Sequence, residues 1–322
     1  MPTLESLLIV TQRTALEDLI ARFNTRSQAE FYIEQQAKQN PAYKGGAFTE
    51  YQQAHDAYHV SLDLLLKSLP RGVKQQSIER SFLPNFKFSG HDLVITLGRD
   101  GLVINTAKYL TTEPILALNP DPTRVDGVLI PFQISEAREW LERAFQDRAT
   151  VKPISMAKAE LNDGQVLYAV NDLFIGARTH VSARYTIEFG KQSEQHSSSG
   201  IIVSTGAGST GWLQSIVTGA FRIAQGVAQS DLEAPPADQY RMDWSSNELT
   251  FAVREPFTSK TSQANMVFGK IGPKQKMILT SFMPDYGVIF SDGIEADYLN
   301  FNSGAVASIG LAERKANLIV RS

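Results

Sequence analysis

The chain has 322 residues, a formal net charge of −3 and no cysteine. The chain is longer than is usual for a domain with a single hydrophobic core, so two domains are expected. Lysine and arginine are dispersed, which argues against nucleic acid or an anionic membrane as the main partner and leaves small molecules as the expected ligands. The lack of cysteine excludes disulfides, thiolate catalysis and cysteine metal ligands, and it fits a reducing compartment.

The first residues do not predict a targeting segment. Acidic Glu5 precedes the only short apolar run, so the charged start and long apolar centre of a secretory signal are missing. No segment approaches the length of a membrane span. We therefore expect a cytoplasmic protein.

The N-terminal part of the chain predicts alternating strands and helices. Short apolar runs predict strands over 7–10 and 73–82, and apolar residues at helical spacing predict helices over 16–23, 26–37 and 51–66. The opening is therefore of βα type.

The long predicted helix contains His55 and His59, which are four residues apart. This spacing suits two ligands of one metal ion. Two histidines without a third ligand in reach are weak evidence, so a solvated or packed pair is the favoured interpretation, and no metal site is predicted.

A tight turn follows the buried strand expected over 93–97. The sequence Gly98-Arg99-Asp100-Gly101 ends the apolar run, and helical spacing begins after it. Glycines let such a turn present bare N–H groups to a phosphate at the start of a helix. Asp100 repels phosphate and is better explained by a role toward a cation or a reacting hydroxyl. The structural alternative is a βα turn in which Asp100 only caps the helix.

A second polar loop follows the next predicted strand. Residues 114–118 predict a buried strand, and the polar segment Asn119 to Gly127 comes directly after it. Ligands of open parallel sheets bind at the carboxyl ends of the strands, so these two loops define a plausible crevice. An amphipathic helix over 134–145 ends the helix-rich part.

From about residue 150 the pattern changes to short alternating runs, which predict a mostly β domain. We therefore expect an α/β domain over 1–148 and a β-rich domain over 149–322. Asn162-Asp163-Gly164 is a strong hairpin turn. Residues 192–199 are expected to form a polar loop, and strands are expected over 150–161, 165–174, 184–189 and 277–282.

A second glycine-rich turn, Gly206 to Gly211, matches the pattern GxGxxG and follows a strand expected over 201–204. A dinucleotide fingerprint also requires an acidic residue at the end of the next parallel strand, and the chain has none there. Two interpretations remain. The turn is either a ligand loop with hydroxyls from Thr205, Ser209 and Thr210, or a purely structural start of a helix.

Taken together, these motifs resemble the NAD kinase family, most closely its mitochondrial-type branch. The family's GGDG turn falls on 98–101, its Asn-acid pair on Asn171-Asp172, and its TGxGSxxW segment on 205–212. Order and spacing agree from about residue 90 onward, whereas the first 80 residues share only the βα pattern. Further matching segments are 119–127, 254–256 and 301–308.

The resemblance implies a Rossmann-like α/β domain, a C-terminal β-sheet domain and a substrate between them. The implied reaction is phosphoryl transfer from ATP, with Mg²⁺, to the adenosine 2′-hydroxyl of NAD. A homodimer is also implied.

The resemblance also implies roles for individual residues. Asp100 would contact and help to deprotonate the 2′-hydroxyl, and Asn171 and Asp172 would bind ribose hydroxyls. The adenosine part would be held by Thr210, Gly211, Trp212 and Ser215. The phosphate and nucleotide contacts would come from Gly98, Arg99, Gly101, Thr205, Gly206, Gly208 and Ser209.

The chain departs from the family pattern at two positions of the first turn. Arg99 replaces the second glycine, and Leu102 replaces a hydroxyl residue. Arg99 either supplies a charge-assisted phosphate contact or fills the space into which a phosphate would come. The alternatives to an NAD kinase are a lipid or sphingosine-type kinase, which also has a GGDG turn, and a catalytically silent nucleotide-binding protein.

Overall fold

The structure is a computed structural model that describes residues 4–39, 47–228, 233 and 235–321. The chain divides into two compact units. The first comprises 1–106, 113–151 and 318–322, and the second comprises 107–112 and 152–317. Each unit is thus made of separate segments, whereas the sequence suggested one continuous segment for each domain.

The first unit is built on a parallel sheet. Strand β1 (Ser6–Thr11) pairs with β2 (Lys74–Glu79) on one side and with β3 (Asp92–Leu97) on the other. Strand β4 (Pro114–Asn119) follows β3, and the short β5 (Phe132–Gln133) pairs with β4. All residues of β3 and β4 are buried, which explains their continuous apolar runs. The predicted α/β domain is confirmed.

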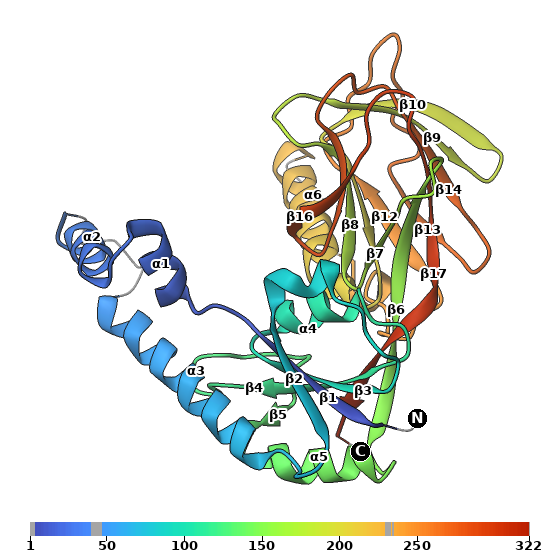
Figure 1. Ribbon diagram of the computed structural model, residues 1–322. Coiled ribbons are helices and arrows are strands. Elements are labelled where there is room, and N and C mark those ends of the chain that lie inside the picture. Colours follow the sequence, from blue (N-terminus) through green and yellow to red (C-terminus); the bar gives the residue numbers. More distant parts are fainter. Residues whose placement is uncertain (1–3, 40–46, 229–232, 234, 322) are drawn as a thin grey trace. The chain divides into compact units, whose positions relative to one another are not determined.

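Two helices cover one face of this sheet. They are α3 (Phe48–Ser68) and α5 (Ala137–Phe145), whose Leu65, Trp140 and Leu141 pack against the buried strand residues. Helix α4 (Asp100–Ala107) lies on the other face (Figure 1). The 3₁₀ turns Arg80–Asn85 and Ile134–Glu136 precede β3 and α5.

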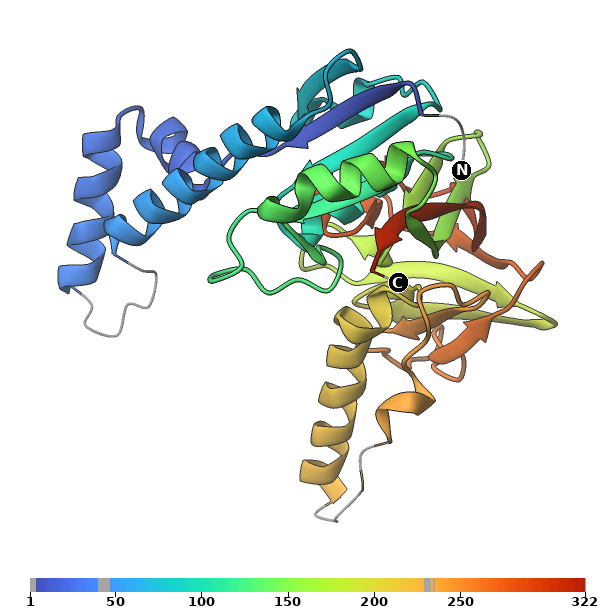
Figure 2. The same cartoon turned by 90° about the horizontal axis from the view of Figure 1, so that it is seen from below.

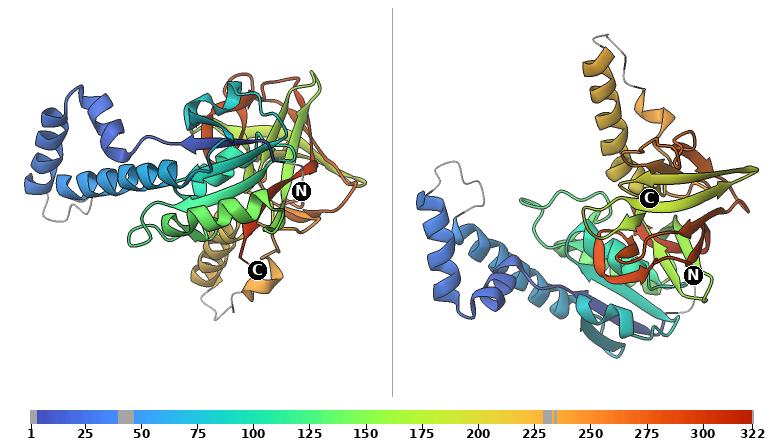
Figure 3. Two further views of the ribbon diagram at one scale, coloured as in Figure 1. Left: turned by 60° about the horizontal axis from the view of Figure 1, so that its bottom comes forward. Right: turned by 90° about the horizontal axis from the view of Figure 1, so that it is seen from above.

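The helices α1 (Ala15–Phe23) and α2 (Arg26–Gln39) pack against the start of α3 (Figure 3). Their small core contains Leu16, Ile33 and Phe48. Helix α1 begins with a capping box, in which Thr14 and Glu17 bond to each other's backbone N–H groups. This local motif fixes where Glu17 lies.

The second unit contains two sets of antiparallel strands with a shared core that includes Tyr185, Phe251 and Phe301. One sheet has the order β13-β12-β11-β8-β15-β16, and the other set has the order β10-β9-β14-β17, with β6 pairing with β17 and β7. The first sheet consists of β8 (Asp172–Ala177), β11 (Ile201–Ser204), β12 (Leu249–Val253), β13 (Phe268–Ile271), β15 (Gly287–Ser291) and β16 (Ile294–Asn300). The other strands are β6 (Thr150–Leu161), β7 (Val166–Ala169), β9 (Ala183–Phe189), β10 (Gln192–Ser198), β14 (Met277–Ser281) and β17 (Val306–Val320).

The long helix α6 (Trp212–Ala228) belongs to this unit and follows the 3₁₀ turn Gly208–Thr210. Its Leu213 is buried, whereas Ile223 and Val227 are exposed. Figure 2 shows the helix running away from its own sheet. A further 3₁₀ turn spans Ala237–Gln239.

Three predicted boundaries were wrong. Residues 192–199 do not form a loop, because β10 pairs with β9 from Gln192 to Ser198 and buries the alternate residues His196 and Ser198. The run 165–174 is divided into β7 and β8. The strand expected over 73–82 ends at Glu79. The hairpin at 162–164 is confirmed, with Gly164 in the left-handed region at φ +88°.

Among the helices of the described residues, none combines the length and the apolar character that crossing a membrane requires.

Candidate active site

The Gly98–Gly101 turn connects β3 to α4, as the sequence predicts. The carboxylate of Asp100 does not cap the helix. It accepts hydrogen bonds from the backbone N–H groups of Val128 (3.0 Å) and Leu129 (3.1 Å), one on each oxygen. Burial raises the pKa of Asp100, although the two N–H groups act in the opposite direction. The side chain therefore has a fixed orientation and an increased affinity for a proton.

A glycine makes this contact possible. A β-carbon at Gly127 would lie 2.6 Å from Asp100 Oδ1 and 2.2 Å from Ile130 Cγ1. The loop after β4 can thus approach Asp100 only because residue 127 has no side chain. This role of Gly127 is not predicted from the sequence, although Gly127 ends the polar loop 119–127.

The two glycines of the turn differ. A β-carbon at Gly98 would come within 2.8 Å of Leu102 Cδ2, so a side chain there would require Leu102 to shift. A β-carbon at Gly101 would have no neighbour within 4 Å. Neither glycine has a positive φ. Packing within the protein therefore does not explain why residue 101 is a glycine.

Arg99 is exposed beside a pocket of about 710 Å³. The pocket is also lined by Gln12, after β1, and by Pro120 and Asp121, after β4. This position agrees with the crevice expected at the carboxyl ends of the strands. Within the described part of the chain, the guanidinium of Arg99 has no hydrogen-bond or ion-pair partner, so it is available to an anionic ligand.

The Asn171-Asp172 pair lies at the break between β7 and β8. The carboxylate of Asp292 accepts hydrogen bonds from the backbone N–H groups of Val170 (3.0 Å), Asn171 (2.7 Å) and Asp172 (3.2 Å). In return, the N–H of Asp292 donates to the carbonyl oxygen of Asp172 at 2.9 Å. Asp292 therefore sets the backbone path of the pair.

The side chain of Asp172 is unusual in its electrostatics. Burial, with a smaller contribution from the negative charge of Asp292, raises the pKa of Asp172 to about 7 against the opposing effect of the Ser204 hydroxyl. Asp172 Oδ1 is buried and has no hydrogen-bond partner among the described residues. A buried polar oxygen without a partner is rare in proteins and suits contact with a ligand.

The second glycine-rich turn packs directly against this pair. A β-carbon at Gly208 would lie 2.3 Å from the carbonyl oxygen of Asn171, and one at Gly206 would lie 1.8 Å from that of Asp243. The hydroxyl of Thr205 donates to the carbonyl oxygen of Val170.

Ser209 is also used within the protein. Its hydroxyl donates to the carbonyl oxygen of Gly206 at 2.7 Å and accepts from the N–H of Met242 at 3.1 Å. The path of the turn is thus determined by four residues, which are Thr205, Gly206, Gly208 and Ser209. Nucleotide binding by these residues stays a prediction.

Residues that come after Ser209 in the chain face outward. Thr210, Gly211, Trp212 and Ser215 are exposed. The Trp212 ring is stacked on Phe174, with the ring centroids 5.9 Å apart, and the guanidinium of Arg254 lies 5.4 Å from the Trp212 centroid. These contacts fix the tryptophan at the start of α6 and leave part of it accessible.

The predicted residues therefore form two groups. Residues 98–101 come together in the first unit. Residues 171–172 and 205–215 come together in the second, where the N–H of Thr205 donates to the carbonyl oxygen of Asn171 at 2.9 Å. Asp292 is not predicted from the sequence, where its only signal is the turn-forming pair Asp292-Gly293 between two apolar runs.

A parallel α/β unit, followed in the chain by a mostly antiparallel β unit, is also the fold of known NAD kinases. Two solved structures share it. Yeast NADH kinase complexed with NADH has a TM-score of 0.60 and 12% identity, covering 98% of this chain and 84% of that one. An NAD kinase from Archaeoglobus fulgidus in complex with ATP has a TM-score of 0.55 and 16% identity, covering 82% and 89%.

Sequence comparison finds related proteins as well. A probable NADH kinase of Oryza sativa is 24% identical over 241 residues, which are 67% of each chain. An NAD kinase of Clostridium kluyveri is 26% identical over 156 residues, 46% of this chain and 54% of that protein. No family profile matches the chain. The resemblance to NAD kinases predicted from the motifs is confirmed by these relatives and by the fold.

Proposed function

We propose that this protein is an ATP-dependent NAD kinase, which transfers a phosphoryl group from ATP to the adenosine 2′-hydroxyl of NAD or NADH. The proposal is supported by relatives and fold neighbours that are named NAD or NADH kinases. The observation that carries it is the Asp100 carboxylate, which two backbone N–H groups hold in the turn after β3. In the family pattern, this acid contacts the 2′-hydroxyl.

In the proposed reaction, Asp100 takes the proton of the 2′-hydroxyl while the hydroxyl oxygen attacks the γ-phosphorus of ATP. A bond forms between that oxygen and phosphorus, the bond to the β–γ bridging oxygen breaks, and ADP leaves. The raised pKa of Asp100 suits a general base, because proton transfer is most efficient when the pKa lies close to the working pH. The fixed orientation of the carboxylate reduces the entropic cost of reaching this geometry.

The remaining residues would bind the two nucleotides. Asn171 and Asp172 bind ribose hydroxyls, and the unpaired Asp172 Oδ1 is suited to accept from one of them. Arg99 contacts donor phosphates from its position beside the pocket. The adenosine part is held by Thr210, Gly211, Trp212 and Ser215.

Mg²⁺ enters with ATP and neutralises phosphate charge when bound. Carboxylate oxygens, which this ion prefers, are present in the first unit at Asp100. We also propose that the enzyme is a cytoplasmic homodimer, as the resemblance to the family implies.

The direct test is an assay of the purified full-length protein with ATP and Mg²⁺ and with NAD or NADH in separate reactions. An NADP-specific dehydrogenase measures the product. We expect NADP or NADPH to form in proportion to enzyme concentration. If neither product forms while nucleotide titration still detects binding, the protein is a silent nucleotide-binding protein and the proposal is wrong.

A further inference from the structure

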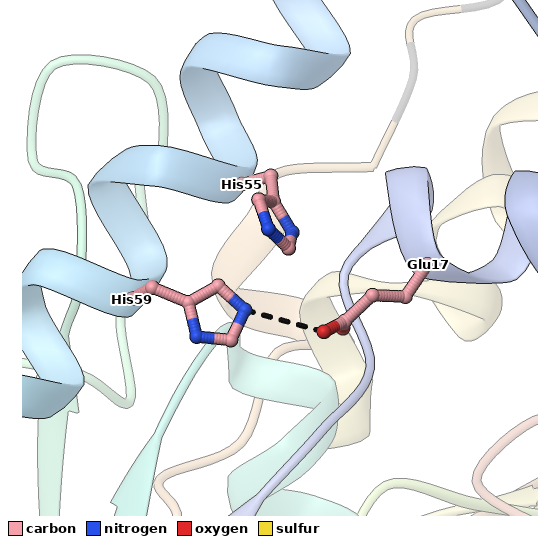
Figure 4. Close-up of side chains that lie close together, drawn as sticks. All are labelled: Glu17, His55 and His59. Carbon is pink, nitrogen blue, oxygen red and sulfur yellow. Dashed lines mark hydrogen bonds and ion pairs between the residues drawn. The ribbon is translucent and has the colours of Figure 1, made fainter. Parts of the chain in front are cut away.

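Three potential metal ligands lie together in the first unit, away from the residues assigned to the kinase reaction. They are Glu17 of α1 and His55 and His59 of α3 (Figure 4). One ligand atom from each residue lies within 4.8 Å of the other two. The histidine spacing suits two ligands but did not by itself predict a metal site, and folding brings in a third group from a helix about 40 residues earlier in the chain.

The separation between Glu17 and His59 fits a shared ion. Glu17 Oε1 lies 3.2 Å from His59 Nε2. Two ligand atoms that bind one tetrahedral zinc ion at about 2.0–2.1 Å are about 3.3 Å apart. The two groups also form a hydrogen bond at this distance, which is at the long end of the N–H···O range. The distance therefore allows both atoms to bind one ion.

Hydrogen bonds through Thr14 orient the side chains of Glu17 and His55. The Thr14 hydroxyl lies 3.1 Å from Glu17 Oε2 and 2.8 Å from His55 Nδ1, so it joins two of the ligands. In the tautomer in which His55 Nδ1–H donates to this hydroxyl, the lone pair of Nε2 is free for a metal. The N–H of Thr14 also donates to Glu17 Oε2 at 2.7 Å, so that Oε1 remains available. Metal-binding histidines are commonly oriented by such a bond on the other ring nitrogen.

The cluster is open on one side. Glu17 and His59 line a cavity of about 490 Å³, and their side chains are 36% and 44% exposed. Water can therefore reach the cluster and complete the coordination. Two imidazole nitrogens and one carboxylate suit zinc and neighbouring transition metals, whereas Mg²⁺ prefers oxygen ligands only.

We propose that Glu17, His55 and His59 bind one divalent transition-metal ion, with zinc as the best match, and that a water molecule completes a four-coordinate site facing the cavity. The site joins α1 to α3 and does not depend on the proposed kinase function.

Zinc binding to the full-length protein tests the proposal. Untagged protein is freed of metal with a chelator and titrated with Zn²⁺ in the presence of excess Mg²⁺, with calorimetry as the readout. We expect one equivalent to bind with micromolar or tighter affinity and the thermal midpoint to rise, since the folded state alone offers this set of ligands. Co²⁺ in place of Zn²⁺ should give the visible absorption bands of a four-coordinate ion.

Variants identify the ligands. His55→Asn, His59→Asn and Glu17→Gln should each weaken zinc binding at least about tenfold, whereas the matched control His180→Asn, at an exposed histidine of the second unit, should bind like the wild type. The wild-type titration tests for zinc binding directly, so the proposal can be judged even where a variant fails to fold. The absence of saturable zinc binding up to 100 μM free ion, or unchanged affinity in the folded variants, would overturn the proposal and leave Glu17 and His59 as a simple ion pair between the helices.

Discussion

The carboxylate of Asp292 accepts a hydrogen bond of 2.7 Å from the backbone N–H of Asn171, a residue that lies 121 positions earlier in the chain. The N–H groups of Val170 and Asp172 donate to the same carboxylate. Asp292 has a left-handed backbone, with φ +57°, in the turn between β15 and β16. One acidic residue thus fixes the break between β7 and β8 that carries the proposed ribose-binding pair.

Asp292→Asn should destabilise the second unit and weaken NAD binding. An asparagine side chain has one acceptor oxygen, and its NH₂ group would face backbone N–H donors. The loss should be about 2 kcal/mol of unfolding free energy, because buried donors lose their partners. Chemical denaturation and an NAD titration measure the two effects.

Asp285→Asn, at an exposed acid shortly before β15, is the matched control and should behave like the wild type. If Asp292→Asn has wild-type stability and NAD affinity, the carboxylate does not position Asn171 in the way described.

Asp172→Asn should change the pH dependence of stability. The pKa of Asp172 rises from the usual 3.8 to about 7 in the folded protein, so the folded state binds the proton more tightly than the unfolded state. The contribution of this group to stability is therefore present below pH 4 and is lost as the pH rises toward 7. Asparagine does not ionise, so the stability of the variant relative to the wild type should increase by roughly 2–4 kcal/mol between pH 4 and pH 8.

Urea denaturation of both proteins at pH 4, 6 and 8 measures this difference. A difference that stays constant over the range would mean that Asp172 ionises normally in the folded protein. NAD affinity should fall in the variant at pH 8, where the wild-type side chain is a carboxylate that accepts from a ribose hydroxyl.

Asp100→Asn should remove activity and also disturb the loop after β4. Loss of a general base typically lowers the rate by about 10²–10⁴-fold. The asparagine NH₂ would face the N–H of Val128 or Leu129, so a modest loss of thermal stability should accompany the kinetic effect.

Kinetics and thermal denaturation of Asp100→Asn, beside the exposed loop variant Asp126→Asn, separate the two effects. A stable variant that keeps most of its turnover would show that Asp100 is not the base.

The sequence could predict features that depend on neighbouring residues. The buried β3 and β4 follow from unbroken apolar runs, and the turn at 98–101 follows from its glycines. Strand β10 was missed because its buried positions hold the polar residues His196 and Ser198, which bond to Glu194 and Tyr185. Asp292 and Glu17 were missed for a related reason, since each meets its partners through contacts between distant segments.

The last prediction concerns Arg99, where the chain departs from the GGDG pattern. The side chain is exposed beside the pocket of about 710 Å³, and the described residues provide it with no partner. This geometry favours recruitment of the guanidinium to a donor phosphate. Arg99→Gly should therefore raise the KM for ATP by roughly 10- to 100-fold, the equivalent of about 1.5–3 kcal/mol for a charge-assisted hydrogen bond.

Arg99→Met keeps the bulk and removes the charge, so it should show a similar rise in KM. Arg124→Met is the control from the same pocket, and it should change KM little because the Arg124 guanidinium is already bonded to Asp121 and Gln53. Steady-state kinetics with ATP as the varied substrate compare the three. If Arg99→Gly instead gains activity while Arg99→Met does not, the arginine blocks the phosphate site. If both variants match the wild type, Arg99 is a surface residue without a role in the reaction.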